Sequence, residues 1–476
     1  MLDFNFKVAS YRSKSETEII NDFKKVLYED KITAMKFLFF IRDREEGLGE
    51  RRLFRVIIKH LAHTEPTIIK YVVPIIAEYG RFDDLLELFD TPLEKNVIDL
   101  FTDQLDEDAK NVRNNKPISL LAKWLPSINA SSINTKERAK KIIKQWGVTE
   151  EFYRKMLSKL RQYIDVTERK MCANEWDKIK YENVPSRANL NYNDAFLRHD
   201  EARRREFLGQ VEKGEKKIHA GKLYPHDIVH KYADTIRFDE TLEQLWKALP
   251  QKEIANTLVV ADGSGSMTST IGRTNVTALD VANALAIYFA EHNKGEFNNT
   301  YITFSENPQL VRFNKTDSLH AKIGKALSYH EVANTNIEKV FGLILKTAID
   351  NKLSQEEMPK NILIISDMEF DDCAVTSERT GWRYTRPDEK LFKVIEKYYA
   401  QYGYKLPKLI FWNVASRTGT IPMKENDLGV ALVSGFSTNI AEMVMNDKLD
   451  PLEILLDKLN TPRYEKITKI LQKLLK

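Results

Sequence analysis

Five oxygen-bearing side chains in the C-terminal half of the chain are of the types that bind a divalent cation. They are two carboxylates and three hydroxyls: Asp262, Ser264, Ser266, Thr335 and Asp367. Because the set contains no Cys or His, it suits Mg²⁺, or alternatively Mn²⁺ or Ca²⁺, and argues against zinc or copper. Two acids leave little excess negative charge against a doubly charged ion. Such a site keeps water ligands and can accept one more acid from outside.

Short apolar runs lead to both carboxylates and predict buried strands. Residues 256–262 end on Asp262, and residues 361–367 end on Asp367. Further strands are expected at 299–305, 408–414 and 429–436, with an antiparallel edge hairpin completed by 310–314, and helices at 277–293, 316–328, 336–350, 388–403 and 438–447. Strands that alternate with helices predict a parallel, doubly wound α/β sheet. Ligands bind beyond the carboxyl ends of strands in such sheets.

The spacing of these residues resembles a known metal site. Asp-x-Ser-x-Ser after a first strand, Thr on a second loop and Asp on a third resemble the metal-ion-dependent adhesion site of von Willebrand factor type A domains. By that resemblance, Ser264, Ser266 and Thr335 bind the ion directly or switch in and out. Asp262 and Asp367 hold coordinated waters, and a partner's Glu or Asp completes the octahedron. The small residue usual before the Thr is Asn334 here. A serine-rich strand–helix turn with capping hydroxyls is the alternative explanation.

The first 245 residues are expected to be helical. Apolar residues recur at three- and four-residue spacing in segments 17–30, 30–46, 51–63, 67–80 and 83–90, which are separated by Gly or Pro. Successive helices of this length predict an α-solenoid or a ring of HEAT-like hairpins, without a strict repeat. We therefore expect an α + α/β protein: a HEAT-like helical domain at 1–245, a doubly wound, Rossmann-like domain at 254–448 and an amphipathic C-terminal helix at 449–476. The Lys-rich face of this last helix is either solvated or lies against the helical domain.

Four segments of the helical half resemble the TROVE-type, Ro-autoantigen-like module. They read IRDREEGLGERRLF (41–54), AEYGRFDDLLEL (77–88), LAKWLP (121–126) and LYPHDIV (223–229). The resemblance implies a ring of helices that binds structured or misfolded RNA as a ribonucleoprotein, mainly through phosphates. It also implies that the von Willebrand domain closes the ring. The first segment has a simpler explanation, because Gly47 and Gly49 permit the positive φ of a helix–helix turn.

Charge patterning supplies the candidate RNA contacts. Net charge is only +4, but residues 136–161 hold nine Lys and Arg against three Glu. A local positive excess attracts phosphates, although a solvated helical face is the commoner explanation of such a run. On charge alone the candidates are Arg42, Arg44, Arg51, Arg52, Lys140, Lys141, Lys144, Arg203, Arg204 and Arg205.

Readings as an enzyme have weaker support. His226 and His230 stand four residues apart, as in zinc proteases, but Asp227 replaces the usual Glu and no third ligand follows. A helix that begins at Pro225 explains the segment without metal. The Ser/Asp loop is not G-x-S-x-G, and no P-loop is present. No catalysis is therefore expected.

Composition suggests where the protein acts. The N-terminus has no apolar signal segment, and no apolar run is long enough to span a bilayer. Only two cysteines are present, Cys172 and Cys373, which fits a reducing, cytoplasmic compartment. The remaining alternatives are an RNA-binding protein and a metal-dependent protein–protein adaptor or assembly component. RNA binding weakens with added salt, whereas an acid-to-metal bridge is abolished by chelator.

Overall fold

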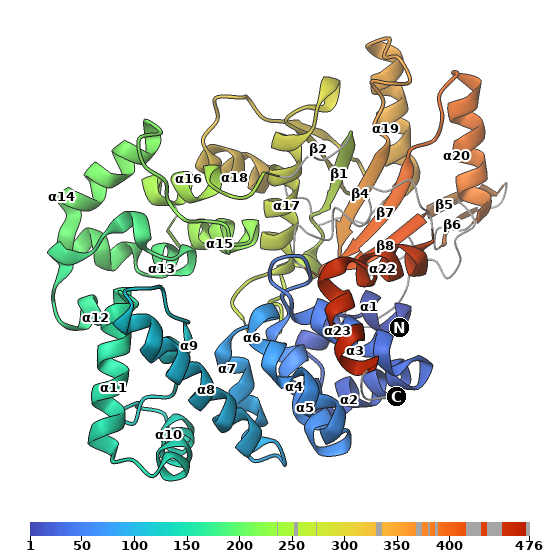
Figure 1. Ribbon diagram of the computed structural model, residues 1–476. Helices are drawn as coiled ribbons and strands as arrows, with labels where there is room; N and C mark the ends of the chain where they lie inside the picture. Colours follow the sequence, from blue (N-terminus) through green and yellow to red (C-terminus); the bar gives the residue numbers. More distant parts are fainter. Residues whose placement is uncertain are drawn as a thin grey trace. The chain divides into compact units, whose positions relative to one another are not determined.

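The computed structural model describes the chain except for residues 236, 252–255, 273, 330–335, 368–373, 379–380, 386–388, 416–429, 436–449 and 473–476. The chain divides into two compact units, which alternate along the sequence. The sheet unit consists of Met1–Ser15, Pro185–Asn193 and Glu206–Lys458, and the helical unit of Glu16–Val184, Asp194–Arg205 and Leu459–Lys476. The predicted fold class, α + α/β, is confirmed (Figure 1).

A six-stranded sheet organises the sheet unit. Its strand order is β3-β2-β1-β4-β7-β8, and all neighbours are parallel except β2 and β3. The strands are β1 (Thr257–Asp262), β2 (Thr300–Phe304), β3 (Leu310–Arg312), β4 (Asn361–Ser366), β7 (Lys408–Asn413) and β8 (Val430–Ser434). A separate antiparallel hairpin is made by β5 (Ala374–Glu378) and β6 (Gly381–Thr385). The parallel strands and the antiparallel edge strand agree with the predictions.

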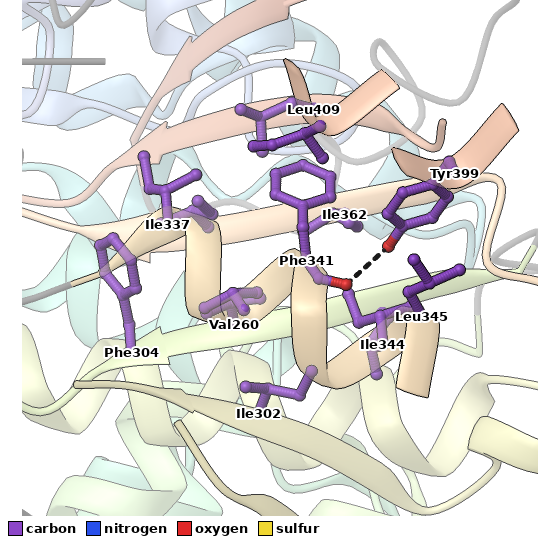
Figure 2. Packing of buried hydrophobic residues seen from close by; sticks show 14 of the residues in the cluster. Val260, Ile302, Phe304, Ile337, Phe341, Ile344, Leu345, Ile362, Tyr399 and Leu409 are labelled. Atoms are coloured by element: carbon purple, nitrogen blue, oxygen red, sulfur yellow. Dashed lines mark hydrogen bonds between the residues drawn. The ribbon is translucent and has the colours of Figure 1, made fainter. Parts of the chain in front are cut away.

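Helices bury the central strands. Every residue of β1, β2 and β4 is buried, as expected for parallel strands covered on both faces. Along β1, alternate residues point to opposite faces, so Leu258 and Val260 join a core cluster with α19 (Ile337–Asp350). Figure 2 shows Phe341 and Ile344 of α19 within this cluster, where the Tyr399 hydroxyl donates to the Phe341 carbonyl at 2.9 Å.

The sheet unit includes helices from several parts of the chain. They are α1 (Leu2–Phe6), α13 (Ser186–Asn191), α15 (Pro225–Thr235), α16 (Glu240–Lys247), α17 (Ala278–His292), α18 (Leu319–Ser328), α20 (Glu389–Gln401) and α22 (Pro451–Leu459). Helix α15 packs on α17, and α17 packs on β1. Helix α17 is buried around most of its circumference because it lies between these elements. The units therefore do not follow the sequence boundaries expected at 245 and 448.

The N-terminal segment also packs in the sheet unit. Helix α1 contacts β8, and Phe6 is part of the core cluster. The Asn413 side chain donates to the Phe6 carbonyl at 3.2 Å, and the Ala9 amide donates to the Ser434 hydroxyl at 3.1 Å. The segment thus lies at the carboxyl ends of β7 and β8.

Short helices build the helical unit. They are α2 (Glu16–Glu29), α3 (Lys31–Arg42), α4 (Arg51–Thr64), α5 (Pro66–Val72), α6 (Ile76–Tyr79), α7 (Phe82–Leu85), α8 (Glu94–Arg113), α9 (Leu121–Trp124), α10 (Ile133–Trp146), α11 (Glu150–Tyr163) and α12 (Thr167–Cys172). Helix α14 (Asn193–Glu212) contributes residues to both units. Gly49 has a φ of 72° in the turn before α4, as expected for a helix–helix turn, whereas Gly47 does not have the positive φ that the sequence suggested.

The C-terminal segment forms two helices where one was predicted. The second, α23 (Pro462–Gln472), begins at Pro462, which cannot donate a backbone hydrogen bond to continue α22. Helix α23 packs on α3 and α5, and Arg463 forms a bidentate ion pair with the buried Asp43. This helix therefore lies against the helical unit instead of being solvated. Within the described residues, no helix has the length and apolar content that a membrane span needs.

Candidate functional site

The carboxyl ends of β1 and β4 bring the predicted acidic residues to one edge of the sheet. Asp262 is the last residue of β1, and Asp367 directly follows β4. The two strands are parallel neighbours, and Ala261 pairs with Ile365 in the register. Parallel neighbours end at the same edge, so the chain fold places both carboxylates at the position where ligands bind in such sheets.

The loop after β1 arranges two hydroxyls beside Asp262. The Ser264 amide donates to Asp262 Oδ1 at 2.8 Å, which turns the chain back toward the strand end. The Oγ atoms of Ser264 and Ser266 form a hydrogen bond and are 3.0 Å apart. Neighbouring oxygens in an octahedron with metal–oxygen bonds of 2.0–2.1 Å also lie about 3 Å apart. The spacing of the two hydroxyls therefore suits two adjacent ligands of Mg²⁺.

Burial makes this edge favourable for a cation. Asp262 and Asp367 are each 2% exposed. Burial, with a smaller contribution from the nearby charge of Asp367, raises the pKa of Asp262 to about 6, although hydrogen bonds from Ser366 and Ser264 oppose the shift. The Ser366 hydroxyl, at 2.6 Å, and the Ser264 amide both donate to Asp262, and both donors are neutral. A bound cation would favour the ionised carboxylate, so the residues present fit a hard divalent ion.

Thr335, the fifth predicted residue, lies outside the described residues. Its neighbour Asn336 is the N-cap of α19, and the Asn336 side chain accepts from the Lys339 amide at 2.9 Å. The prediction that Thr335 directly precedes a helix is consistent with this cap.

Two serines at the same edge were not predicted. Ser366 donates to Asp262 Oδ2, and so fixes the carboxylate from the neighbouring strand. Ser305 follows β2, one residue beyond Phe304, the register partner of Asp262. Ser305 is buried, and its hydroxyl has no hydrogen-bond partner among the described residues. The sequence signal that could have indicated them is a serine at the carboxyl end of each of these two apolar strands, β2 and β4.

The two histidines of the zinc alternative are explained by local contacts. His226 is buried in α15, and burial lowers its pKa to about 4. His230 Nδ1 lies 2.9 Å from Asp280 Oδ2, and Asp227 accepts from the Tyr224 amide at the helix start. In the part of the chain that the structure describes, no group of three or more His, Cys, Asp or Glu could hold a metal. The helix-start explanation therefore accounts for this segment.

Two of the predicted RNA contacts are wrong because their side chains are buried. Arg42 is 1% exposed, and its Nε donates to Asp84 Oδ2 at 2.7 Å. Arg204 is 0% exposed, with its guanidinium 5.1 Å from the centre of the Tyr181 ring. Neither side chain can reach a phosphate on the surface. Arg42 is paired with Asp84 in the interior of the helical unit, and Arg204 packs against the rings of Tyr181 and Phe196.

The other eight candidates differ in their surroundings. Ion pairs link Arg51 with Asp83, Lys141 with Asp90 and Glu94, Arg203 with Asp200, and Arg205 with Glu201. Arg44 and Arg52 are half-buried. Lys140 and Lys144 on α10 are exposed, and neither has an ion pair within the described residues. These two lysines keep the strongest claim to a phosphate among the ten.

Fold and site together define a protein class: an α/β unit with a candidate hard-cation site at its strand edge, in one chain with an α-helical unit. Two family models, both for domains of unknown function, match the chain: DUF7788 over residues 256–466 and DUF2828 over residues 131–262. The chain is 31% identical over 498 residues to uncharacterized protein L728 of Acanthamoeba polyphaga mimivirus, covering 95% of this chain and 83% of that protein. This chain belongs to the family of that mimivirus protein.

Two solved structures also show similarity. The Ro (RSR) protein of Deinococcus radiodurans aligns with a TM-score of 0.47 and 14% identity, over 89% of this chain and 92% of that one. The VWA domain of SpRpn10 aligns with a TM-score of 0.25 and 16% identity, over 41% of this chain and 95% of that one.

Proposed function

We propose that this chain is a non-catalytic RNA-binding protein whose sheet unit holds one divalent cation for an acidic ligand. The observation that carries the metal site is the 3.0 Å spacing of the Ser264 and Ser266 hydroxyls beside the buried Asp262. These two hydroxyls and Thr335 would bind the ion, and Asp262 and Asp367 would hold it through water. Mg²⁺ suits this donor set best, since Mg²⁺ keeps several waters.

An acidic group is the ligand that this site would accept. The two carboxylates only balance the double charge of the ion, and the other ligands that the protein supplies are neutral hydroxyls. An Asp or Glu of a protein partner would displace water and add a charge-assisted contact in a buried setting. No His among the described residues supports an activated serine at this edge, so binding is proposed here and not catalysis.

Manganese titration of the full chain tests the metal site. We expect the wild type to bind one Mn²⁺, followed by the loss of the free-ion signal in electron paramagnetic resonance. Asp262→Asn keeps the side-chain shape but removes the charge, and should weaken binding about 10–100-fold, as for residues that act through a ligand. Asp350→Asn removes an exposed charge of α19 in the same unit and should bind as the wild type. Unchanged binding by a folded Asp262→Asn would contradict the assignment, and Ser264→Ala gives an independent check.

The RNA-binding part of the proposal is supported by the basic surface of α10 and α11. Lys140, Lys144 and Lys159 are exposed, and none of the three has an ion pair within the described residues. The two helices are consecutive and in contact. Unpaired cations on adjacent helices are available to bind phosphates without reading the bases.

Salt-dependent binding of a fluorescent RNA hairpin with a single-stranded tail tests this part. Replacing Lys140, Lys144 and Lys159 together by Gln should reduce the salt slope by about 2, since each phosphate contact contributes about 0.7 on single strands. The matched control replaces three exposed lysines of the sheet unit, Lys346, Lys397 and Lys405, and should keep the slope. If the wild type binds no RNA but binds an acidic partner in a chelator-sensitive way, the metal-dependent adaptor is the better description.

A further inference from the structure

The helical unit contains a cavity that the proposed metal and RNA surfaces do not use. Its volume is about 710 Å³, within the ~300–1,000 Å³ typical of small-ligand sites. Residues of α9, α10, α11 and α12 line it. Five of the lining residues are cationic: Lys123, Arg138, Arg154, Arg161 and Arg169. Lys123, Arg138 and Arg169 are paired with Glu168, Glu87 and Glu175, so Arg154 and Arg161 are the lining cations that no carboxylate offsets within the described residues.

Arg161 places a positive charge in the wall of the cavity. Its Nε donates to the Ala122 carbonyl, one terminal nitrogen to the Ser127 hydroxyl and the other to the Leu125 carbonyl, each at 2.8 Å. All three acceptors are neutral, so none of them offsets the charge. A guanidinium has five N–H donors, and these contacts use three. Arg161 is therefore held rigidly with donor capacity remaining.

Arg154 adds a second cation on the same side of α11. It precedes Arg161 by seven residues, two helical turns, which brings both side chains to one face about 10 Å apart along the axis. Arg154 is exposed and has no ion pair within the described residues. Asp83, a carboxylate of the cavity lining, is paired with Arg51 and Arg55, so its negative charge is already balanced by cations outside the lining.

An aromatic wall accompanies these cations. Trp124 lines the cavity and is half-buried. The Arg81 guanidinium lies 4.2 Å and the Lys123 ammonium 5.9 Å from the centre of the Trp124 ring, and of these two cations Lys123 lines the cavity. Tyr153 is a buried part of the lining, and its hydroxyl donates to the Pro126 carbonyl at 2.8 Å. Tryptophan provides a surface on which a nucleobase stacks, and arginine binds phosphate bidentately.

We infer that this cavity binds a single nucleotide, with its phosphate at Arg154 and Arg161 and its base against Trp124. This site goes beyond the proposed metal and phosphate-backbone functions. The nucleotide could be a free 5′-monophosphate or the phosphorylated end of an RNA chain, because both present the same base and terminal phosphate. An acidic peptide supplies the charge but no base for Trp124.

Cys172 offers a direct readout, since it lines the cavity and is exposed. In the full chain with Cys373→Ser it is the single cysteine. We expect 5′-AMP to slow its alkylation by iodoacetamide several-fold in a saturable way, followed by mass spectrometry. Adenosine, which lacks the phosphate, should protect at much higher concentration. Absence of protection by 5′-AMP and by 5′-phosphorylated RNA would overturn the inference, as would equal protection by an acidic peptide.

Neighbouring residues on α11 provide matched variants. Arg154→Gln should weaken 5′-AMP binding about tenfold or more, because it removes one charge-assisted contact. Lys155→Gln removes an exposed charge that is paired with Glu151, and should leave the affinity unchanged. Equal affinities of the two variants would also overturn the inference. Arg154 is exposed on the surface of a helix, so both variants should fold, which circular dichroism checks.

A last comparison separates the two sources of the nucleotide. Single-stranded RNA with a 5′-phosphate is tested beside the same RNA with a 5′-hydroxyl. Stronger protection of Cys172 by the phosphorylated RNA than by 5′-AMP assigns the cavity to an RNA end, and the reverse assigns it to a free nucleotide. If salt-sensitive RNA binding persists without protection of Cys172, the cavity inference fails and the proposed function stands. If 5′-AMP protects Cys172 but the protein binds no RNA, the cavity inference stands and the proposed RNA binding fails.

Discussion

Replacing Asp84 by asparagine probes the most buried charge network in the helical unit. Asp84 is fully buried and accepts from Arg42 Nε at 2.7 Å and from Arg55 Nε at 2.6 Å. The Arg81 amide donates to the same carboxylate at 3.0 Å. Asparagine keeps the shape of the side chain but leaves the buried Arg42 guanidinium without its counter-charge. Breaking a buried pair in this way costs about 3–5 kcal/mol.

Urea unfolding of the full chain, followed by circular dichroism, measures this loss. Hydrogen exchange of peptides from α3 and α7 shows whether the destabilised region is the helical unit. The control is Asp22→Asn, which disrupts an exposed pair with Lys25 and should cost at most about 1 kcal/mol. A loss below about 1 kcal/mol for Asp84→Asn would refute the reasoning, since the network would then contribute no more than a surface pair.

The pH dependence follows from the same contacts. Burial by itself would raise the pKa of Asp84, but the charges and hydrogen bonds of Arg42 and Arg55 hold it below the ordinary value. A carboxyl whose pKa is depressed by folding stabilises the fold above the pKa of the unfolded residue, about 4, and loses this contribution as the pH falls through the lower folded value. Asp84→Asn should therefore remove part of the acid sensitivity of the wild type.

Three further predictions concern stability. Gly47→Ala should lower the melting temperature, because the added methyl would overlap the Phe40 carbonyl. The control Gly209→Ala lies inside α14 with open space around it, and should be neutral or stabilise by about 0.5–1 kcal/mol. An equal effect of the two substitutions in thermal melts would contradict this. Arg463→Ala should speed hydrogen exchange in α23, because the buried Asp43 loses its bidentate partner; unchanged exchange would show that apolar packing alone holds the helix. Mg²⁺ at 100 times its dissociation constant should stabilise the sheet unit by about 2.7 kcal/mol in calorimetry, reversibly with chelator, and no shift would count against a bound ion.

Much of the sheet unit could be predicted because its signals are local. Short apolar runs that end on Asp262 and Asp367 are typical of strands buried on both faces, and the structure places β1 and β4 at those positions. The spacing of Ser264 and Ser266 likewise predicts the two hydroxyls of the candidate metal site. Ser366 could not be assigned a role in this way, because its hydrogen bond to Asp262 depends on the pairing of strands separated by about a hundred residues.

Other features depend on contacts that periodicity does not reveal. The apolar pattern at 67–80 predicts one helix, but Pro74 divides it into α5, a short 3₁₀ turn and α6. Arg42 was chosen as an RNA contact on charge, although the side chain is buried against Asp84, which lies 42 residues away in sequence. The packing of α1 and α15 in the sheet unit likewise involves partners distant in sequence.

The segments that resemble the Ro-type module have a structural explanation in this chain. Residues 41–54 contribute Arg42 and residues 77–88 contribute Asp84 to one buried ion-pair network, which Arg55 completes. An added methyl at Gly80 would overlap the Asp84 carboxylate. Such residues are constrained by packing and charge pairing whether or not RNA is bound. Packing and charge pairing therefore account for these segments in this chain, and the proposed RNA binding is to be judged on the exposed cations of α10 and α11.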